Sequence, residues 1–360
     1  MPSVRLVGWV RHEGSSVNSI NITCVVGARP NFIKMAALIA DFRRRPCFSV
    51  RLVHTGQHFS PEMSAAFFED LELPEPDVNL GISAGTQTVQ TAEIMMALET
   101  VLLENRPDLL VVVGDVTSTL AASLVGAKMG IPIAHVEAGL RSFDKTMPEE
   151  INRILVDAVS DYLFVTEASG MTNLLAAGIK PEKVHFVGNV MIDTLVRFRD
   201  KAKQSDILDR LGLSAHSYAL VTLHRPSNVD VGDRLRRLLG VFAELTKHLP
   251  VVFPVHPRTR ARMEETGMQV SMLHLTAPLS YLDFVRLMSE ARLVLTDSGG
   301  IQEESTILQV PCLTLRENTE RPVTIEQGTN RLAGTEPHRI LEMSLSTLAG
   351  GRVSQRVPDL

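Results

Sequence analysis

Short runs of aliphatic and β-branched residues alternate along this chain with longer stretches in which apolar residues recur at helical spacing. In the first half the apolar runs cover 22–28, 49–56, 109–115, 131–138 and 161–167. Helical spacing is found at 32–42, 61–71, 88–104 and 118–129, and again after Pro148. This alternation is typical of a parallel sheet with helices on both faces, and it predicts a doubly wound sheet.

The second half repeats this plan, with apolar runs at 218–228, 251–257, 272–278, 293–300 and 310–317. In both halves the first strand is followed by Arg-Pro, and a later apolar strand ends in Asp. These residues are Arg29-Pro30 and Asp115 in the first half, and Arg225-Pro226 and Asp297 in the second. The repeat indicates two related units, and we interpret 185–196 as the connection between them.

The predicted fold is therefore α/β, with two Rossmann-like doubly wound domains that face a shared cleft. The predicted bounds are 1–185 for the first domain, 186–345 for the second and 346–360 for a tail. Residues 1–20 precede the first strand, and we interpret them as an extension with no assigned function. Ligands of such sheets bind beyond the carboxyl ends of the strands, so the cleft is the predicted site.

Composition narrows the class of protein. At 360 residues the chain is long enough for two cores, and 44% hydrophobic with 21% charged residues is ordinary for a globular protein. The net charge of −5 gives no reason to expect nucleic acid. No apolar run approaches the ~20 residues that cross a bilayer, so we expect no membrane insertion and a cytoplasmic protein. Cys24, Cys47 and Cys312 lack metal-ligand spacing and are expected to be buried thiols.

The turn Asp297-Ser298-Gly299-Gly300 closes an apolar strand and opens a helix. Free backbone N–H groups and the positive end of the helix dipole would point outward there, so the turn predicts an anion site, such as a diphosphate site. A plain helix cap is the alternative. Glu303 and Glu304 follow at once, and a carboxylate beside a phosphate site can accept the two hydroxyls of a ribose. Neither half has GxGxxG or GxxxxGK[ST], which disfavours a dinucleotide cofactor and P-loop chemistry.

Cationic side chains gather in the loops of both halves. They are Arg29, Lys34, His224, Arg225, His256, Arg258 and Arg321. Three carboxylates stand out in the first half: Asp115, Glu137 and Glu149. Crowded and partly desolvated carboxylates can exchange protons near neutrality, although salt bridges to Arg141 or Arg153 would explain any one of them.

At these positions the chain resembles the non-hydrolysing UDP-N-acetylglucosamine 2-epimerases, which have the glycosyltransferase-B-type fold. The resemblance runs from about Ile22 to Thr335. Its ordered motifs are GARPNFIKMAAL, TGQH, GDVTSTLAAS, HVEAGLRS, PEEINR, VGNVMIDTL, TLHRPSN, PVHPRTR, TDSGGIQEES and ENTERP. The resemblance implies that the substrate is a UDP-sugar, that no cofactor or metal takes part, and that the enzyme is a homodimer.

The resemblance also implies roles for individual residues. Asp115, Glu137 and Glu149 would move the proton at C2 of the sugar, and His224 would assist departure and return of UDP. The residues that would hold the substrate are Arg29, Lys34, Arg141, Arg225, His256, Phe284, Ser298, Gly299, Gly300, Glu304 and Arg321. Phe284 stands where the family packs an aromatic ring near the uracil.

The family's substrate-activation site is only partly present. Gln57, His58 and Gln87 remain, but Ser60 replaces a Gln, and HRPSN, with Ser227, replaces HRREN. We therefore expect weak or absent activation by substrate. The same changes leave room for a UDP-2,3-diacetamido uronate as substrate. The sequence is also compatible with a glycosyltransferase that uses UDP-N-acetylglucosamine, with a hydrolysing enzyme and with a non-catalytic nucleotide-sugar sensor.

Overall fold

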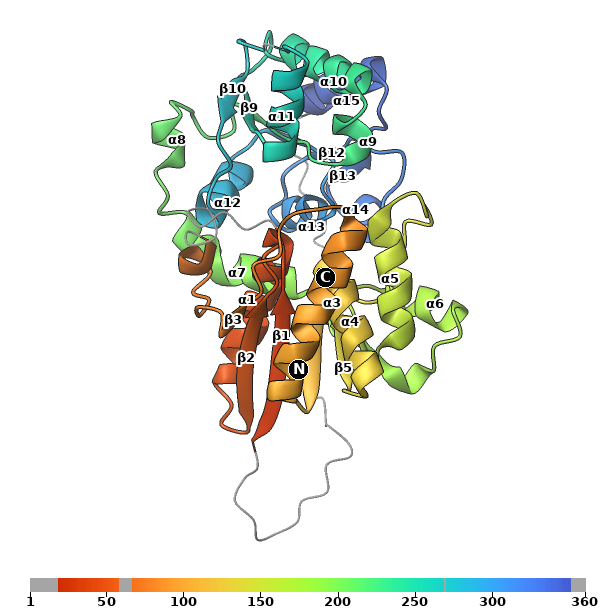
Figure 1. The fold of residues 1–360 in the computed structure, drawn as a ribbon. Helices are drawn as coiled ribbons and strands as arrows, with labels where there is room; N and C mark the ends of the chain where they lie inside the picture. The colour runs from red at the N-terminus through yellow and green to blue at the C-terminus, as the bar shows by residue number, and fades with distance from the viewer. Residues whose placement is uncertain (1–18, 58–66, 269, 351–360) are drawn as a thin grey trace.

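The computed structural model describes residues 19–57, 67–268 and 270–350, and it contains two α/β units stacked one on the other (Figure 1). Each unit is built around one sheet in which all described strand pairs are parallel. The predicted fold class is confirmed.

The first sheet has seven strands, five of which correspond to the predicted apolar runs. In spatial order they are β3 (Val78–Asn79), β2 (Phe48–His54), β1 (Ile20–Val26), β4 (Leu109–Val113), β5 (Ile133–Val136), β6 (Tyr162–Val165) and β7 (Val184–Phe186). We predicted that 185–196 connects the two units. This was wrong for its first two residues, because they belong to β7, which pairs with β6. A strand of three residues carries too short an apolar run to stand out in the sequence.

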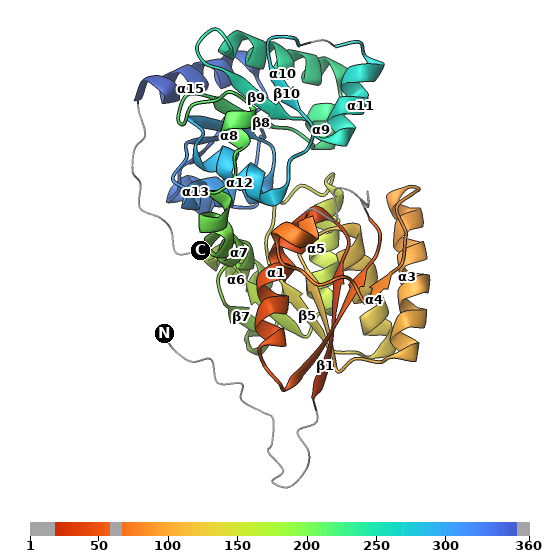
Figure 2. The same ribbon diagram turned by 90° about the vertical axis from the view of Figure 1, so that its left-hand side faces the viewer.

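Helices cover both faces of this sheet. They are α1 (Arg29–Arg43), α3 (Gln87–Glu104), α4 (Thr117–Met129), α5 (Pro148–Val159) and α6 (Ala168–Ala176), with the turn η1 (Pro181–Lys183) and the connecting helix α7 (Val190–Ala202). Alternate residues of β1 face opposite layers: Cys24 packs with α1 and α7, and Val25 packs with α3 and α4. Figure 2 shows the two layers on either side of the strands.

The second sheet has six strands. In spatial order they are β10 (His274–Thr276), β9 (Val251–Pro254), β8 (Ala219–Thr222), β11 (Leu293–Thr296), β12 (Cys312–Thr314) and β13 (Asn330–Leu332). Its helices are α8 (Ile207–Arg210), α9 (Pro226–Val229), α10 (Gly232–Leu245), α11 (Pro257–Glu265), α12 (Tyr281–Ser289), α13 (Gly299–Ile307), α14 (Val323–Glu326) and α15 (Pro337–Gly350). Among the described residues, no helix is long and apolar enough to cross a membrane.

Both sheets reverse their winding at equivalent points, between β1 and β4 in the first and between β8 and β11 in the second. The loops at these points carry the repeated Arg-Pro and Asp residues. A crevice opens at such a switch point because successive helices leave in opposite directions. The topology therefore brings Asp115 and Asp297 to equivalent places in the two units.

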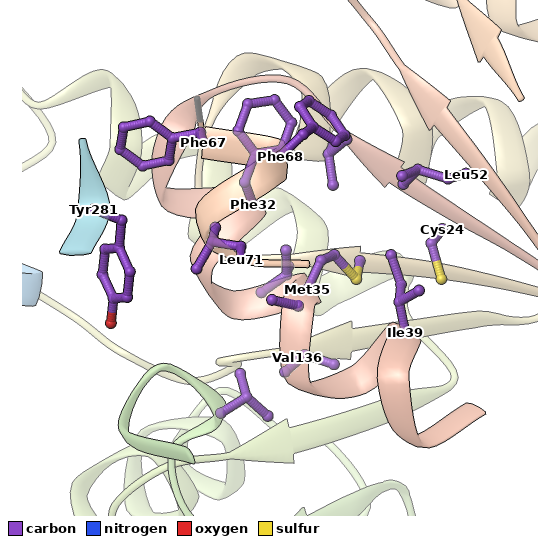
Figure 3. Packing of buried hydrophobic residues seen from close by; sticks show 14 of the residues in the cluster. Cys24, Phe32, Met35, Ile39, Leu52, Phe67, Phe68, Leu71, Val136 and Tyr281 are labelled. Atoms are coloured by element: carbon purple, nitrogen blue, oxygen red, sulfur yellow. The ribbon is translucent and has the colours of Figure 1, made fainter. Parts of the chain in front are cut away.

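Helix α7 joins the two units and packs against α1 on one side and against α12 and α13 on the other (Figure 1). The hydroxyl of Thr194 donates to the Ile33 carbonyl oxygen at 2.7 Å. One apolar cluster extends across the junction, where Tyr281 of α12 approaches Phe67, with ring centroids 6.5 Å apart (Figure 3). The predicted domain bounds stay a prediction, and α15 continues past residue 345 to Gly350.

Candidate functional site

Glu137 follows β5 and forms an ion pair that joins the two units. Its φ of 69° places it in the left-handed region, which a non-glycine residue enters only when its surroundings impose it. Oε2 lies 2.6 Å from Nζ of Lys34, and Oε1 accepts from Nη2 of Arg321 at 2.8 Å. The side chain is only 2% exposed. Both carboxylate oxygens are thus occupied by cations, one from each unit.

Asp115 follows β4 and remains accessible, with 23% of its side chain exposed. Its Oδ2 lies 2.5 Å from Nη1 of Arg153. Burial opposes ionisation, but the charges of Arg153, Lys34 and Arg225 outweigh it and lower the pKa of Asp115. The group is therefore a carboxylate at neutral pH, which suits a proton acceptor.

Glu149 lies in the first turn of α5, and its side chain is 33% exposed. Its Oε1 is 3.4 Å from Nη1 of Arg225, which belongs to the second unit. Arg225 also approaches Glu320, with 3.5 Å between Nη2 and Oε1. Asp115 and Glu149 are therefore the two predicted carboxylates that a molecule between the units could reach.

Glu150 is a part of the site that the sequence did not single out. Its Oε2 accepts from the backbone N–H of Ser142 at 2.9 Å and from Nη2 of Arg153 at 2.6 Å, and its Oε1 accepts from Phe143 N–H at 3.1 Å. Burial acts to raise the pKa of Glu150, but these hydrogen bonds and the Arg153 charge lower it. Glu150 and Arg153 thus fix the position of the loop after β5 relative to Asp115.

His224 follows β8 and is oriented by Asp297, which follows β11. The imidazole Nδ1 is 3.0 Å from Oδ1 of Asp297. The same carboxylate accepts the backbone N–H groups of His224 and Arg225, and the amide of Asn228 at 3.2 Å. Burial acts to raise the pKa of Asp297, and His224 together with these donors lowers it. The sequence suggested Asp297 only as the start of an anion turn and not as the partner of His224.

The N-terminus of α13 is closely packed at its two glycines. Ser298 is the N-cap residue, and its hydroxyl makes no capping hydrogen bond. A Cβ on Gly299 would lie 2.5 Å from Oε1 of Glu320, and one on Gly300 would lie 3.1 Å from Sδ of Met191. The backbone N–H groups of this turn and the helix dipole make it suitable for an anion.

Arg321 lies behind this turn and is surrounded by carboxylates. Besides Glu137, its guanidinium lies 2.8 Å from Oε2 of Glu303 and 3.4 Å from Oε1 of Glu320. Burial raises the pKa of Glu303, against the opposing charge of Arg321. Burial also raises the pKa of Glu304 to about 8. Glu304 is therefore largely a neutral carboxyl at pH 7 in this state, with Oε1 3.3 Å from the hydroxyl of Tyr281.

Known proteins match this chain over almost its whole length. The family profile described as UDP-N-acetylglucosamine 2-epimerase matches residues 40–357. A UDP-N-acetylglucosamine 2-epimerase homolog from Methanococcus maripaludis is 43% identical over 330 residues, covering 90% of this chain and 91% of that protein. The chain belongs to the UDP-N-acetylglucosamine 2-epimerase family. The prediction of an epimerase-family enzyme is thereby confirmed.

Two further relatives of the family are informative. A crystal structure of the Methanocaldococcus jannaschii UDP-GlcNAc 2-epimerase in complex with UDP-GlcNAc and UDP has a TM-score of 0.90 and 38% identity, covering 95% of this chain and 96% of that chain. The UDP-2,3-diacetamido-2,3-dideoxy-D-glucuronate 2-epimerase of Pseudomonas aeruginosa is 38% identical over 355 residues, which is 94% of this chain and 99% of that protein.

Several residues implied by the family resemblance have structural partners of their own. The guanidinium of Arg29 lies 5.2 Å from the centre of the Phe67 ring. His256 caps α11 by accepting from the backbone N–H of Arg258 at 3.2 Å. Phe284 is half-buried against the apolar cluster of α8 and α12. Their roles toward a substrate stay predictions.

Arg141 and the regulatory candidates also stay predictions. Nη2 of Arg141 lies 2.7 Å from Oδ2 of Asp157, within the first unit. Gln57 is buried, and its side-chain oxygen accepts from the hydroxyl of Ser118 at 2.8 Å and from the Ser118 N–H in the first turn of α4. Gln87 is exposed at the start of α3. His58 lies outside the described residues.

Proposed function

We propose that this chain interconverts UDP-N-acetylglucosamine and UDP-N-acetylmannosamine by elimination and re-addition of UDP. The observation that carries the proposal is the placement of two accessible carboxylates, Asp115 and Glu149, opposite an anion-binding helix terminus and His224. Proton-transfer groups then lie in one unit and leaving-group contacts in the other. Family membership supports the same activity.

The chemistry explains why both sets are needed. The C2 hydrogen of an acetamido sugar is barely acidic, so another event must activate it. When the C1–O bond breaks, its electron pair leaves with the β-phosphate of UDP, and C1 gains oxocarbenium character. A carboxylate then takes the C2 proton, and the C–H electron pair forms the C1=C2 bond of 2-acetamidoglucal. Re-addition of UDP, with a proton delivered from the opposite face, gives the C2 epimer.

The second unit would stabilise the departing diphosphate. The N–H groups of Gly299 and Gly300 and the guanidinium groups of Arg225 and Arg321 would supply positive potential where the charge develops, and such preorganised stabilisation is a large term in catalysis. His224, held by Asp297, is placed to assist this departure. Glu304 would accept the ribose hydroxyls, and Phe284 would lie near the uracil.

Two proton-transfer groups are needed because the two faces of the glucal are distinct. Asp115 and Glu149 approach from different elements, the end of β4 and the start of α5. Glu137 is closed off by Lys34 and Arg321 in this conformation. We infer that it aligns these cations until substrate binds and competes for them.

A UDP-2,3-diacetamido uronate is the second candidate substrate. The 38% identity to the Pseudomonas aeruginosa enzyme, over nearly the full length of both chains, favours it. It would use the same elimination, because the changes in the sugar lie at C3 and C6. A homodimer, a cytoplasmic location and a role in polysaccharide precursor synthesis also stay predictions.

Proton NMR of the sugar nucleotide in D2O tests the proposal. With UDP-N-acetylglucosamine we expect deuterium at C2 together with the anomeric signal of UDP-N-acetylmannosamine. Release of UDP with transfer of the sugar to an acceptor, without C2 exchange, would instead support a glycosyltransferase. If this sugar gives neither exchange nor a new anomeric signal, the same measurement with the diacetamido uronate distinguishes the second substrate from a non-catalytic sensor.

A further inference from the structure

His135 in β5 is fully buried directly beneath the site, at 0% exposure. Both of its ring nitrogens face acceptors. Nδ1 is 2.8 Å from Oδ1 of Asp157, and Nε2 is 2.9 Å from the carbonyl oxygen of Gly114. A neutral imidazole has only one N–H, so it could donate to only one of these acceptors. The other nitrogen would then direct its lone pair at an acceptor.

Asp157 is a carboxylate surrounded by donors. Its Oδ2 accepts from Arg141 at 2.7 Å and from the backbone N–H of Gly139 at 3.2 Å, while Oδ1 faces His135. A proton on Oδ1 would allow a neutral His135, but the Arg141 guanidinium favours the ionised carboxylate. With an imidazolium at His135 beside a carboxylate at Asp157, every one of these contacts joins a donor to an acceptor.

These contacts join the two segments that carry the proposed proton-transfer groups. The Gly114 carbonyl immediately precedes Asp115, and the Gly114 N–H donates to the Val136 carbonyl oxygen at 3.0 Å, immediately before Glu137. Asp157 also holds Gly139 and Arg141, so the loop leaving Glu137 is anchored to α5. The same helix carries Glu149 at its other end and Arg153 near its middle.

We propose that His135 is a doubly protonated positioning residue that locks the ends of β4 and β5 to α5. It sets the separation of Asp115, Glu137 and Glu149 without touching the sugar. Part of this proposal rests on the proposed function, because the positioning matters for the C2 proton transfers. The protonation state does not depend on the function, and it can be measured separately.

The protonation state is measured by NMR of the full chain labelled with 15N-histidine. We expect the His135 ring to show two one-bond N–H correlations at neutral pH, identified by their absence in His135→Gln. The variant Asp157→Asn removes the carboxylate and should leave a ring with one N–H. A single N–H correlation for His135 in the wild type would overturn the imidazolium assignment.

Kinetics test the positioning. A glutamine at 135 can donate to one partner only, and its side-chain oxygen then opposes the other. For His135→Gln we expect kcat to fall by about 10²-fold, as a misplacement of about 1 Å can produce, with KM little changed. His274→Gln alters an exposed histidine of β10 and should leave kcat unchanged. An unaltered kcat in a folded His135→Gln protein would reject the positioning role.

The two proposals fail in distinguishable ways. If the wild type shows two N–H correlations but no epimerisation of either sugar, the protonation state stands and the proposed function fails. If the wild type epimerises but shows one N–H, the function stands and the inference about His135 fails. Where His135→Gln does not fold, Asp157→Asn provides both readouts, with kcat expected to fall as the ring loses its second proton.

Discussion

Arg321 and Glu137 bond the two units to each other, with 2.8 Å between Nη2 and Oε1 across a separation of 184 residues in sequence. Lys34 occupies the other carboxylate oxygen of Glu137. A bound diphosphate would attract the same two cations. The Arg321–Glu137 pair therefore holds the units close together by a contact that a substrate can replace.

Replacing Arg321 should weaken the contact between the two units. In Arg321→Gln, Glu137 and Glu303 both lose their shared cation, so we expect a larger radius of gyration in small-angle X-ray scattering without substrate. In kinetics we expect kcat/KM to fall by about 10²- to 10³-fold, as when a transition-state donor is removed. Arg331→Gln, at an exposed position of β13, is the matched control. Identical scattering curves for the two variants would show that Arg321 does not hold the units together.

Replacing Arg153 should cost stability. Its side chain is 2% exposed and pairs with Asp115 and Glu150 at 2.5 and 2.6 Å. Arg153→Met leaves the buried Glu150 and the partly exposed Asp115 without their cation, which we expect to lower the free energy of unfolding by about 3–5 kcal/mol in urea titrations. The exposed pair Arg237–Asp233 provides the control, because Arg237→Met should cost less than about 1 kcal/mol. Equal losses in the two variants would contradict a buried charge network.

The alternation of apolar runs and helical spacing predicted the two sheets well, because parallel strands buried on both faces are nearly continuous apolar segments. It did not predict β3, β7 or β13. Each has only two or three residues and takes its place by pairing with a neighbour, Val78 with Val53 and Asn330 with Cys312. Pairing over such distances leaves no periodic signal in the sequence.

The site was predictable at the ends of strands and much less so within helices. Asp115, Glu137 and His224 could be picked out because each follows an apolar run. Glu150 and Asp157 could not, since a carboxylate in an amphipathic helix usually faces solvent, and only the tertiary packing of α5 shows that both are buried. The structure also bears out the salt bridge that the sequence left open, between Asp115 and Arg153.

Glu304 should make stability depend on pH. Burial raises its pKa from the ordinary 4.5 to about 8, so the folded state retains a proton that the unfolded chain releases. This stabilising contribution is complete below about pH 4.5 and is lost as the pH rises through about 8. In that window the free energy of unfolding should fall by at most about 1.4 kcal/mol per pH unit.

The variant Glu304→Gln cannot titrate at this position. Relative to the wild type it should therefore gain stability as the pH is raised from 5.5 to 8.5, as measured by urea unfolding at each pH. Glu93→Gln changes an exposed residue of α3 and should show the wild-type dependence. Parallel curves for Glu304→Gln and the wild type would mean that Glu304 is ionised in the folded protein.

The assignment of Asp115 and Glu149 to opposite faces of the glucal can be tested by separating C2 exchange from epimerisation. If one group removes the C2 proton of UDP-N-acetylglucosamine and the other protonates the opposite face, each amide variant loses one half-reaction. Removing a general acid or base typically costs about 10²- to 10⁴-fold. Asp115→Asn and Glu149→Gln should therefore both produce UDP-N-acetylmannosamine at least about 10²-fold more slowly.

The two variants should behave differently in D2O, because only one of them retains the carboxylate that faces the C2 hydrogen of UDP-N-acetylglucosamine. That variant can still eliminate UDP, exchange its carboxyl proton with solvent and return the glucal to deuterated UDP-N-acetylglucosamine. The other variant should neither exchange nor epimerise UDP-N-acetylglucosamine, yet it should exchange C2 of UDP-N-acetylmannosamine. The two half-reactions are thus read from opposite substrates. Retained exchange from both substrates in both variants would mean that another group transfers the proton, and Glu137, released from Lys34 and Arg321, would be the residue to replace next. Loss of exchange from both substrates in both variants would contradict the division between two faces, because each residue would then be required for elimination from either epimer.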